Sequence, residues 1–504
     1  MKNIWLLTLL SAAGLSAQPT VTAVLNTVEV PAGIQDTRLS PGIVATIFGT
    51  GFGSSASGVT VTFGGTNAAP IAGQVTPGQM NVQIAFNAPL GSTSVVVTVN
   101  GASSAPFNVT LLQAAPTIGY TAVNMPDIYT LAYTQVTAAT PVKPGTNLIM
   151  YAAGLGQTNP PTTLGTAVTA PVQLASTPTM TIGGVAANIF SATYTSASGY
   201  QINFTVPATV QGAQPVVLSI DGQDSNAVTL PILGITALVS GASFLNTGTA
   251  APEEIVTIYA TALGSKDQIT TGSDTTTAQG VSVTFNGVAA PLFALVTESD
   301  QLNLIVPSEM PTTGTVQVQL TTPTYTSQNF ALLMNPAVPG IFLVYDPSNP
   351  TAQIAAAQFA NTTWLVVPDS TAAALKLAQN CTVSNANPIS SCGQPAAPGD
   401  YLVLYVTGLG AATPNGQANG ATLATGVTAP SDGSVLYETV ATPTIMLGGV
   451  AATPLFSGIV PGFEGLYQIN FQVPPGVANG DAVPLTVSIP GATTGSATMA
   501  IQSR

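Results

Sequence analysis

Residues 199–207 read GYQINFTVP and alternate amide side chains with large apolar ones. Successive side chains of a β-strand point to opposite faces, so Ile202 and Phe204 share one face. Gln201 and Asn203 share the other face. The Gln-x-Asn pattern recurs three times, at residues 79–81, 301–303 and 468–470. This repetition predicts a chain built from copies of one β-rich unit.

Two further signatures accompany each Gln-x-Asn strand. The first runs from Pro through an aliphatic stretch to Gly: PGIVATIFGTGFG (41–53), PGTNLIMYAAGLG (144–156), PEEIVTIYATALG (252–264) and PGDYLVLYVTGLG (398–410). The second places Gly-Gly or Asn-Gly between apolar runs: VTFGGTNAAP (61–70), MTIGGVAANIF (180–190), VTFNGVAAPLF (283–293) and IMLGGVAATPLF (445–456). The first predicts a strand between turns, and the second predicts a tight hairpin.

Composition agrees with an all-β chain. The 504 residues are 46% hydrophobic and only 5% charged, and 49 Gly and 40 Pro interrupt the apolar runs too often for long helices. Each unit contains about seven short strands in roughly 100 residues, which is typical of a β-sandwich. We therefore predict a tandem array of four immunoglobulin-like β-sandwiches. Their predicted bounds are 18–114 (segment 1), 115–233 (segment 2), 234–335 (segment 3) and 336–504 (segment 4), with an inserted hairpin and Cys loop at about 340–397.

The motifs resemble two known families. In segment 1, IFGTGFG, VTFGGTNAAP and the closing VTVNGASSAPF resemble an IPT/TIG domain, which is an immunoglobulin-like sandwich. In segments 2 and 4, motifs such as LYVTGLGAATPNG and GLYQINFQVPPGVANGDAVPLTVSI resemble an uncharacterised C-terminal repeat family of exported acidobacterial proteins. The resemblance implies binding or spacer modules and no particular activity. Segment 3 departs from the pattern, with Glu253 and Ala262 where glycine is usual.

The segments also form pairs. Segment 1 leads through APTIGY (115–120), and segment 3 through PAVPGIF (336–342), into a longer segment. This arrangement indicates duplication of a two-domain block.

The first residues, MKNIWLLTLLSAAGLSAQ, place Lys2 before an apolar run and small residues before Gln18. This pattern predicts a signal peptide, residues 1–17, with cleavage after Ala17. We expect a secreted or cell-surface protein that is not inserted in the membrane after the signal is removed.

Charge and residue types narrow the function. Six basic against 19 acidic residues give a net charge of −13, which disfavours nucleic acid as a partner. The chain has no histidine, so it lacks the commonest general base and zinc ligand. We expect no enzymatic activity, no catalytic residues, no cofactor and no metal site. A hydrolase that uses carboxylates is a remaining alternative.

Two cysteines, Cys381 and Cys392, flank the loop CTVSNANPISSC. In an exported chain this spacing predicts a disulfide. A redox or metal-binding pair is the alternative.

The amides of the repeated strand are predicted to have a structural role: Gln79, Asn81, Gln201, Asn203, Gln301, Asn303, Gln468 and Asn470. Since they recur where the loops differ, we expect them to bond backbone groups of the neighbouring Gly-rich turn. A polar row that binds sugar hydroxyls, or simple solvation, is the alternative.

Two other groups of residues are weaker candidates for a functional site. Asp221, Asp224 and Asn226 offer oxygen ligands for calcium, but Asp221 with Gly222 is explained by a hairpin turn. In an extended stretch, Glu253 and Glu254 would point to opposite faces and form a solvated edge.

Tyr345, Phe359 and Trp364 of the insertion either form an aromatic platform for a glycan or pack their own hairpin. We thus expect a structural or adhesive surface module whose partners are other surface proteins, polysaccharide or further copies of itself. Carbohydrate binding through the domain tips or the insertion is the alternative.

Overall fold

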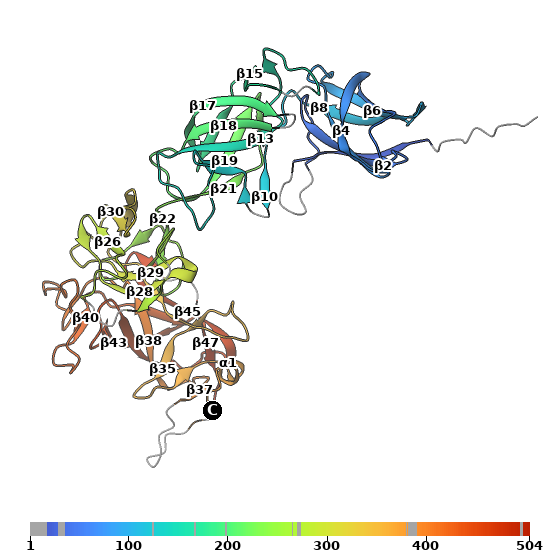
Figure 1. Ribbon diagram of the computed structural model, residues 1–504. Coiled ribbons are helices and arrows are strands. Elements are labelled where there is room, and N and C mark those ends of the chain that lie inside the picture. Colours follow the sequence, from blue (N-terminus) through green and yellow to red (C-terminus); the bar gives the residue numbers. More distant parts are fainter. Residues whose placement is uncertain are drawn as a thin grey trace, which may run out of the picture. The chain divides into compact units, whose positions relative to one another are not determined.

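The computed structural model describes residues 18–28, 36–122, 125–165, 168–196, 199–264, 266–269, 274–379, 381, 391–493 and 497–504. The predicted signal peptide, residues 1–17, lies outside the described residues. The chain divides into two compact units, unit 1 up to Ile232 and unit 2 from Leu233 (Figure 1). Unit 1 contains segments 1 and 2, and unit 2 contains segments 3 and 4, so the division falls between the two predicted pairs.

Segment 1 contains eight strands in its described part. They are β1 (Thr20–Asn26), β2 (Val44–Thr50), β3 (Val59–Phe63), β4 (Thr66–Val75), β5 (Gln79–Gln83), β6 (Gly91–Val99), β7 (Ala102–Ser103) and β8 (Phe107–Leu111). The order of pairing is β1-β2-β5-β4-β3-β6-β7, with β8 on β6. The long strand β4 pairs with both β3 and β5, and thus joins the two layers of the sandwich.

Segment 2 repeats this plan with additional short strands. They are β9 (Thr117–Ile118), β10 (Tyr120–Ala122), β11 (Met125–Pro126), β12 (Ile128–Thr130), β13 (Asn147–Ala153), β14 (Thr158–Asn159), β15 (Val172–Leu174), β16 (Thr179–Ile182), β17 (Val185–Ser196), β18 (Gly199–Thr205), β19 (Gly212–Ile220), β20 (Gln223–Asp224) and β21 (Val228–Ile232). The order is β12-β13-β18-β17-β16-β19-β20, with β21 on β19. Strand β17 joins the layers as β4 does.

Segment 3 forms two separate sheets. Its elements are β22 (Ile235–Ser240), β23 (Thr249–Ala250), β24 (Ile255–Ala260), β25 (Gln268–Ile269), β26 (Ser282–Phe285), β27 (Val288–Ala289), β28 (Leu292–Val296), the 3-10 turn η1 (Thr297–Ser299), β29 (Gln301–Ile305), β30 (Gly314–Thr321) and β31 (Phe330–Met334). The sheets run β22-β24-β29-β28-β25 and β23-β31-β30-β26-β27.

Segment 4 is the largest. Its elements are β32 (Gly340–Ile341), β33 (Leu343–Val344), β34 (Ile354–Ala355), β35 (Ala357–Phe359), β36 (Leu365–Val366), α1 (Asp369–Ala374), β37 (Gly393–Gln394), β38 (Tyr401–Thr407), β39 (Ala412–Pro414), β40 (Tyr437–Thr439), β41 (Thr444–Leu447), β42 (Val450–Ala452), β43 (Pro454–Ile459), β44 (Tyr467–Gln472), β45 (Gly480–Ile489), β46 (Ala492–Thr493) and β47 (Ala497–Ile501). One sheet runs β37-β36-β35-β38-β44-β43-β40-β39 and the other β33-β34-β47-β45-β41-β42.

The predicted insertion is partly an ordinary strand of the sandwich. Short strands β32 and β35 both pair with β38, just as β9 and β12 both pair with β13 in segment 2. The element without a counterpart in segment 2 therefore begins after Phe359. It includes β36, α1 and β37, and β35 and β36 form the hairpin expected there.

The predicted hairpin turns are confirmed by their backbone conformation. The turn pairs are Gly64 with Gly65, Gly183 with Gly184, Asn286 with Gly287 and Gly448 with Gly449, all with φ between 48° and 85°. Two successive left-handed residues define the tight turn that matches strand twist, and glycine and asparagine adopt it at little cost.

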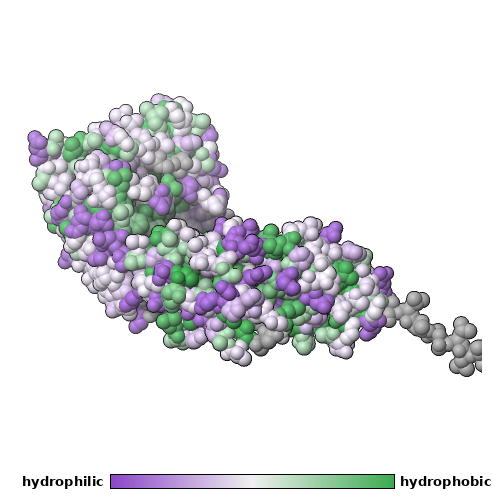
Figure 2. All heavy atoms as spheres, turned by 90° about the horizontal axis from the view of Figure 1, so that it is seen from above, coloured by the Kyte–Doolittle hydropathy of each residue, from purple (hydrophilic) through white to green (hydrophobic). Residues whose placement is uncertain are grey.

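The predicted alternation of the repeated strand is also confirmed. In the described part of the chain, the large apolar clusters centre on the four segments, and each includes the inward-facing residues of its Gln-x-Asn strand. These residues are Met80 and Val82, Ile202 and Phe204, Leu302 and Leu304, and Ile469 and Phe471. Figure 2 shows hydrophobic and hydrophilic residues interspersed over the visible face. The chain is thus a tandem array of immunoglobulin-like β-sandwiches.

The second segment of each unit holds its own first residues through the same device. In segment 2, the Ala115 N–H donates to the Gly154 carbonyl oxygen at 2.8 Å; in segment 4, the Val338 N–H donates to the Gly408 carbonyl oxygen at 2.9 Å. Both glycines have left-handed φ, and a Cβ on either would collide with the carbonyl oxygen of the residue it bonds. Two glycines of the repeated GLG motif are therefore required for the close approach of the chain where it enters segments 2 and 4.

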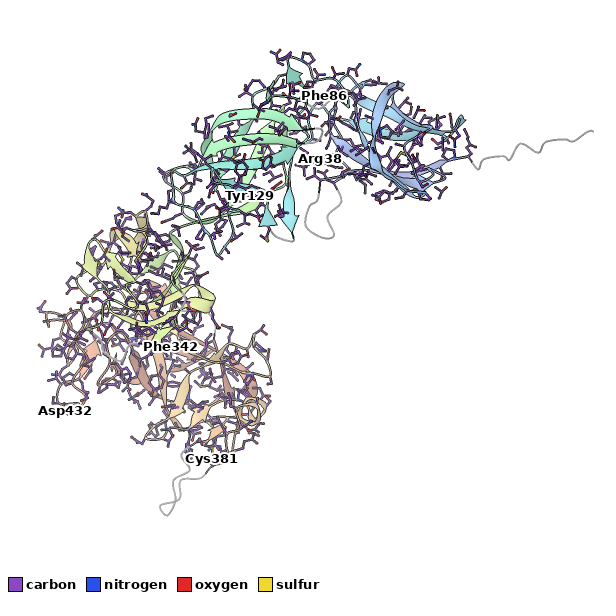
Figure 3. The ribbon with its side chains drawn as sticks, in the orientation of Figure 1. Arg38, Phe86, Tyr129, Phe342, Cys381 and Asp432 are labelled. Carbon is purple, nitrogen blue, oxygen red and sulfur yellow. A yellow bond between two sulfur atoms is a disulfide. The ribbon has the colours of Figure 1, made fainter. Side chains whose placement is uncertain are left out.

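Residues of the predicted calcium candidate have other contacts. The Asn226 side chain bonds both the N–H and the carbonyl oxygen of Ile118 in the same segment, at 2.8 and 3.0 Å. Arg38, labelled in Figure 3, bonds Asp36 of its own segment and the backbone carbonyl oxygen of Asp224. In the described part of the chain, no group of three or more Cys, Asp or Glu residues is placed to hold a metal ion.

Candidate functional site

The outer face of each repeated strand carries the same pattern of side chains. An aromatic residue of the preceding motif strand lies directly opposite the Gln in every segment: Phe48 with Gln79, Tyr151 with Gln201, Tyr259 with Gln301, and Tyr405 with Gln468. The amides thus lie on the sheet surface away from the core.

The hydrogen bonds of these amides differ from the expectation. Thr46 and Thr257 donate to Asn81 and Asn303 at 2.8 Å each, and Gln201 and Gln301 donate to Asn203 and Asn303 at 2.9 and 2.7 Å. For these five amides the predicted backbone partners are wrong, because the groups of the Gly-rich turns bond other backbone groups, such as those of Ala115 and Val338. The amides instead form a side-chain network across the sheet surface.

Asn470 of segment 4 lacks this network. Its Oδ1 is buried and has no hydrogen-bond donor among the described residues. The residue opposite it on β38 is Val403, where segments 1 and 3 have Thr46 and Thr257. Segment 2 also lacks the threonine, since Ile149 lies opposite Asn203, but there Gln201 donates to the asparagine. The acceptor is free in segment 4 because neither Val403 nor Gln468 donates to it.

Asn470 lines a pocket of about 750 Å³ in segment 4. The walls come from the β35–β36 hairpin, from β38, β43 and β44, and from Cys381. The side chains that give the pocket its chemistry are aromatic (Phe359, Trp364, Tyr401 and Phe456) and polar (Asn361, Gln394, Asp400, Asn470 and Arg504). Such a mixture of apolar surface and a few polar groups is typical of small-ligand sites.

The hairpin places its aromatic rings by local bonds. The Phe359 N–H donates to the Trp364 carbonyl oxygen at 3.0 Å, and Asn361 takes a left-handed φ of 61° in the turn. The two rings pack edge to face with centroids 6.5 Å apart. The Arg504 guanidinium lies 5.7 Å from the centre of the Phe359 ring, and its Nη2 is 3.6 Å from Asp400.

The three residues predicted to form an aromatic platform, Tyr345, Phe359 and Trp364, do not all line the pocket. Phe359 and Trp364 line the pocket, but both are buried in the core cluster of segment 4, so packing is their main role. Tyr345 is 66% exposed and is not among the pocket residues. The exposed ring of the pocket belongs instead to Tyr401, which is 55% exposed.

The predicted disulfide between Cys381 and Cys392 is present, and Cys381 contributes to the pocket wall. The Cys381 N–H donates to Oε1 of Gln394 at 2.8 Å, which ties the Cys loop to β37. Figure 3 shows Cys381 at the end of segment 4 that carries α1 and β37.

Replacing both cysteines by serine is expected to lower the free energy of unfolding of segment 4 by about 3 kcal/mol, because the loop-closure constraint on the unfolded chain is lost. Chemical denaturation of the full chain, with and without reductant, measures this change. Reductant should leave the double-serine variant unaffected, and equal stabilities of variant and wild type would contradict the expectation.

Glu253 and Glu254 differ from the predicted solvated edge, because both are buried at the contact between segments 3 and 4. Glu253 has a left-handed φ of 61°, so the alternation expected of an extended strand does not apply to it. Sequence patterns within segment 3 could not reveal the burial, since segment 4 provides the cover.

Comparison with known proteins identifies one domain. Residues 34–111 match the IPT/TIG domain. The IPT/TIG match lies within segment 1 and agrees with the resemblance of its motifs. No curated protein matches the chain.

Three solved structures show weak likeness. The plexin A4 extracellular region is 11% identical, with 98% of this chain and 31% of that chain covered and a TM-score of 0.27. Surface glycan-binding protein PbSGBP-B from Prevotella bryantii is 13% identical, with 51% of this chain and 56% of that chain covered and a TM-score of 0.18. The N-terminal eight Ig domains of Down Syndrome Cell Adhesion Molecule are 10% identical, with 96% of this chain and 48% of that chain covered and a TM-score of 0.17. The chain spans about a third to just over half of their lengths. Resemblance at this level says nothing of what this chain binds.

Among the residues that the structure describes, no helix is long and apolar enough to cross a bilayer.

Proposed function

We propose that this chain is an exported, non-enzymatic surface module that binds polysaccharide in the pocket of segment 4. The observation that carries the proposal is the exposed ring of Tyr401 in the same pocket as the free Oδ1 of Asn470. Adhesion, in this proposal, is contact with a glycan.

The chemistry of a sugar suits these two groups. A pyranose ring has an apolar face of C–H groups, which packs on an aromatic ring, and hydroxyl groups, which donate hydrogen bonds. Tyr401 offers an aromatic surface, and Asn470 offers an acceptor whose desolvation is uncompensated in the free protein. Asn361 and Asp400 add polar groups in the same pocket.

Export, the signal peptide at residues 1–17 and the lack of catalysis are parts of this proposal. The absence of histidine and the net charge of −13 support a non-catalytic protein that does not bind nucleic acid. The likeness of segments 2 and 4 to the repeat family of exported acidobacterial proteins supports the same location.

Replacing Tyr401 by alanine is expected to weaken polysaccharide binding by about tenfold or more, because the apolar face of the sugar loses its contact surface. The measurement is affinity electrophoresis against soluble starch, xyloglucan, galactomannan, pectin and mixed-linkage β-glucan, followed by calorimetry with the polysaccharide that retards the chain. The matched control is Tyr345→Ala, which removes an exposed tyrosine of the same segment outside the pocket.

A second variant tests the free acceptor. Val403→Thr places a hydroxyl where Thr46 and Thr257 bond the equivalent asparagines, so it should occupy Oδ1 of Asn470 and weaken binding by about three- to tenfold. Thr257→Val is the reverse change in segment 3 and should leave binding unaltered. Failure of every polysaccharide to bind, or equal losses in Tyr401→Ala and Tyr345→Ala, would contradict the proposal.

A further inference from the structure

The junction of segments 3 and 4 encloses carboxyl groups. Glu253 and Glu254 lie in the turn between β23 and β24, and Glu464 lies in the loop between β43 and β44; all three are buried. Each has one carboxyl oxygen without a hydrogen-bond partner among the described residues: Oε1 of Glu253, Oε1 of Glu254 and Oε2 of Glu464. A buried, half-bonded carboxylate is costly, whereas a neutral carboxylic acid is much less so.

The other oxygens link the two segments or their turns. Oε1 of Glu464 accepts from the Gly426 N–H at 2.9 Å, and Oε2 of Glu254 accepts from the Ala251 N–H at 2.9 Å. Oε2 of Glu253 lies 3.3 Å from the Tyr467 hydroxyl, so this contact joins segment 3 to segment 4.

The Tyr467 contact favours a protonated Glu253. The Tyr467 hydroxyl has one proton, and its shorter bond, 2.7 Å to the Gly410 carbonyl oxygen, uses that proton. Glu253 therefore bonds well to Tyr467 only as the neutral acid, which donates its own proton to the hydroxyl oxygen. Ionisation of Glu253 would remove this bond between the segments.

Among the described residues, no ion pair involves these groups. The titratable residues that face Glu253 and Glu464 are Glu254, Glu309 and Tyr467. The ion pairs of the described residues, Arg38 with Asp36 and Arg504 with Asp400, lie elsewhere.

Among the described residues, the equivalent junction in unit 1 contains no buried, half-bonded glutamates: Asp36, which accepts from Thr117 across the junction, is paired with Arg38. In the repeated motif, Gly42 and Ile43 stand where segment 3 has Glu253 and Glu254. Phe86 and Tyr194 pack edge to face there, with ring centroids 5.5 Å apart, and Gln83 bonds the Tyr194 hydroxyl at 3.0 Å. The same contact between segments can thus be built without unpaired acids, so the glutamates of unit 2 are an added feature.

Electrostatics agree with the geometry. Burial raises the pKa of Glu253 to about 7, and the charges of Glu464 and Glu309 add to the rise. Burial also raises the pKa of Glu464 to about 7 and that of Glu254 well above its ordinary value. At Glu309 burial acts in the same direction, but hydrogen bonds from Thr425 and Ser308 lower the pKa overall.

We propose that the junction of segments 3 and 4 is a pH-sensitive joint, closed while Glu253 and Glu464 are protonated and loosened when they ionise. The closed joint binds more protons than the loosened one, in which these glutamates regain their ordinary pKa of 4.5. Its stability is therefore complete below about pH 4.5, declines as the pH rises, and is lost above about pH 7. In unit 1 burial acts to raise the pKa of Asp36, but its bonds to Arg38 and Thr117 lower that pKa overall, so that junction should not loosen as the pH rises through 7.

Hydrogen–deuterium exchange of the full chain at pH 5.0 and pH 8.5, corrected for intrinsic rates, tests the joint. Peptides that contain Ile255 and Ser308 report on unit 2, because their N–H groups donate across the junction to the hydroxyl oxygens of Thr407 and Thr425 at 2.8 Å each. We expect their protection to fall by about tenfold or more at pH 8.5, since one pKa unit at one group changes an equilibrium tenfold. The peptide that contains Gly165, whose N–H donates across the junction of unit 1 to Oε1 of Gln83, is the internal control and should keep its protection.

The double variant Glu253→Gln with Glu464→Gln mimics the neutral acids and should stay protected at both pH values. Glu298→Gln alters an exposed glutamate of segment 3 and should behave as wild type. Parallel changes at the Ile255 and Gly165 peptides, or pH-dependent loss of protection in the double variant, would overturn the proposal. If the double variant does not fold, the single variant Glu253→Gln should at least halve the loss of protection between pH 5.0 and pH 8.5. An unchanged loss of protection in this variant would also overturn the proposal.

Discussion

Alanine at Gly408 is expected to lower the free energy of unfolding of unit 2 by about 2–5 kcal/mol. Gly408 has a left-handed φ of 70°, which an L-residue adopts at a cost of about 1–2 kcal/mol. Its added Cβ would also collide with the Val338 carbonyl oxygen and approach Cγ of Glu254 to 3.3 Å. Relief of the collision requires the chain at Val338 to move away from Gly408, which breaks the bond from the Val338 N–H.

Gly399→Ala is the matched control, because Gly399 has a left-handed φ of 96° in the same segment but open space around its Cβ position. It should cost only about 1–2 kcal/mol. Chemical denaturation of both variants measures the difference, and hydrogen exchange at Val338 should increase in Gly408→Ala alone. Equal destabilisation by the two substitutions would show that backbone conformation, and not the close contact with Val338, requires Gly408.

Phe204→Ala is expected to destabilise segment 2 by about 3–5 kcal/mol, because the ring is fully buried in its core and its removal leaves a cavity. Gln201, three residues earlier, faces the sheet surface and donates to the Asn203 side chain at 2.9 Å. Gln201→Ala should therefore cost only about 0.5–1.5 kcal/mol, the net value of one hydrogen bond.

Thermal and chemical unfolding of the two variants in the full chain compare the faces of this strand. A Gln201→Ala variant as unstable as Phe204→Ala would contradict a surface network of amides. It would mean that the amides hold the sandwich together more strongly than their bonds indicate.

The fold was largely predictable because its signals are local. Strand alternation in GYQINFTVP depends only on the period of an extended chain, and the Gly-Gly and Asn-Gly turns depend only on which residues tolerate a positive φ. The disulfide followed from the spacing of Cys381 and Cys392. Four repetitions of each pattern made these local signals unambiguous.

The candidate site was predictable only in part. The sequence drew attention to Phe359 and Trp364 through their aromatic type, yet their burial leaves Tyr401 as the exposed ring of the pocket. A signal for Tyr401 existed, since Val44, Asn147 and Ile255 occupy its position in the other segments. The free acceptor of Asn470 required the cross-strand register, which places Val403 opposite it.

By itself, then, the sequence determined the β-sandwich units, their turns and their pairing, because each depends on neighbouring residues and on backbone conformations that few residue types allow. Tertiary structure alone decided which side chains are covered or left unbonded. Glu253 and Glu254 are buried because segment 4 packs on their turn, and Asn470 lacks a donor because of a residue on another strand. Burial and hydrogen bonding depend on contacts between residues distant in the chain, which a local pattern cannot specify.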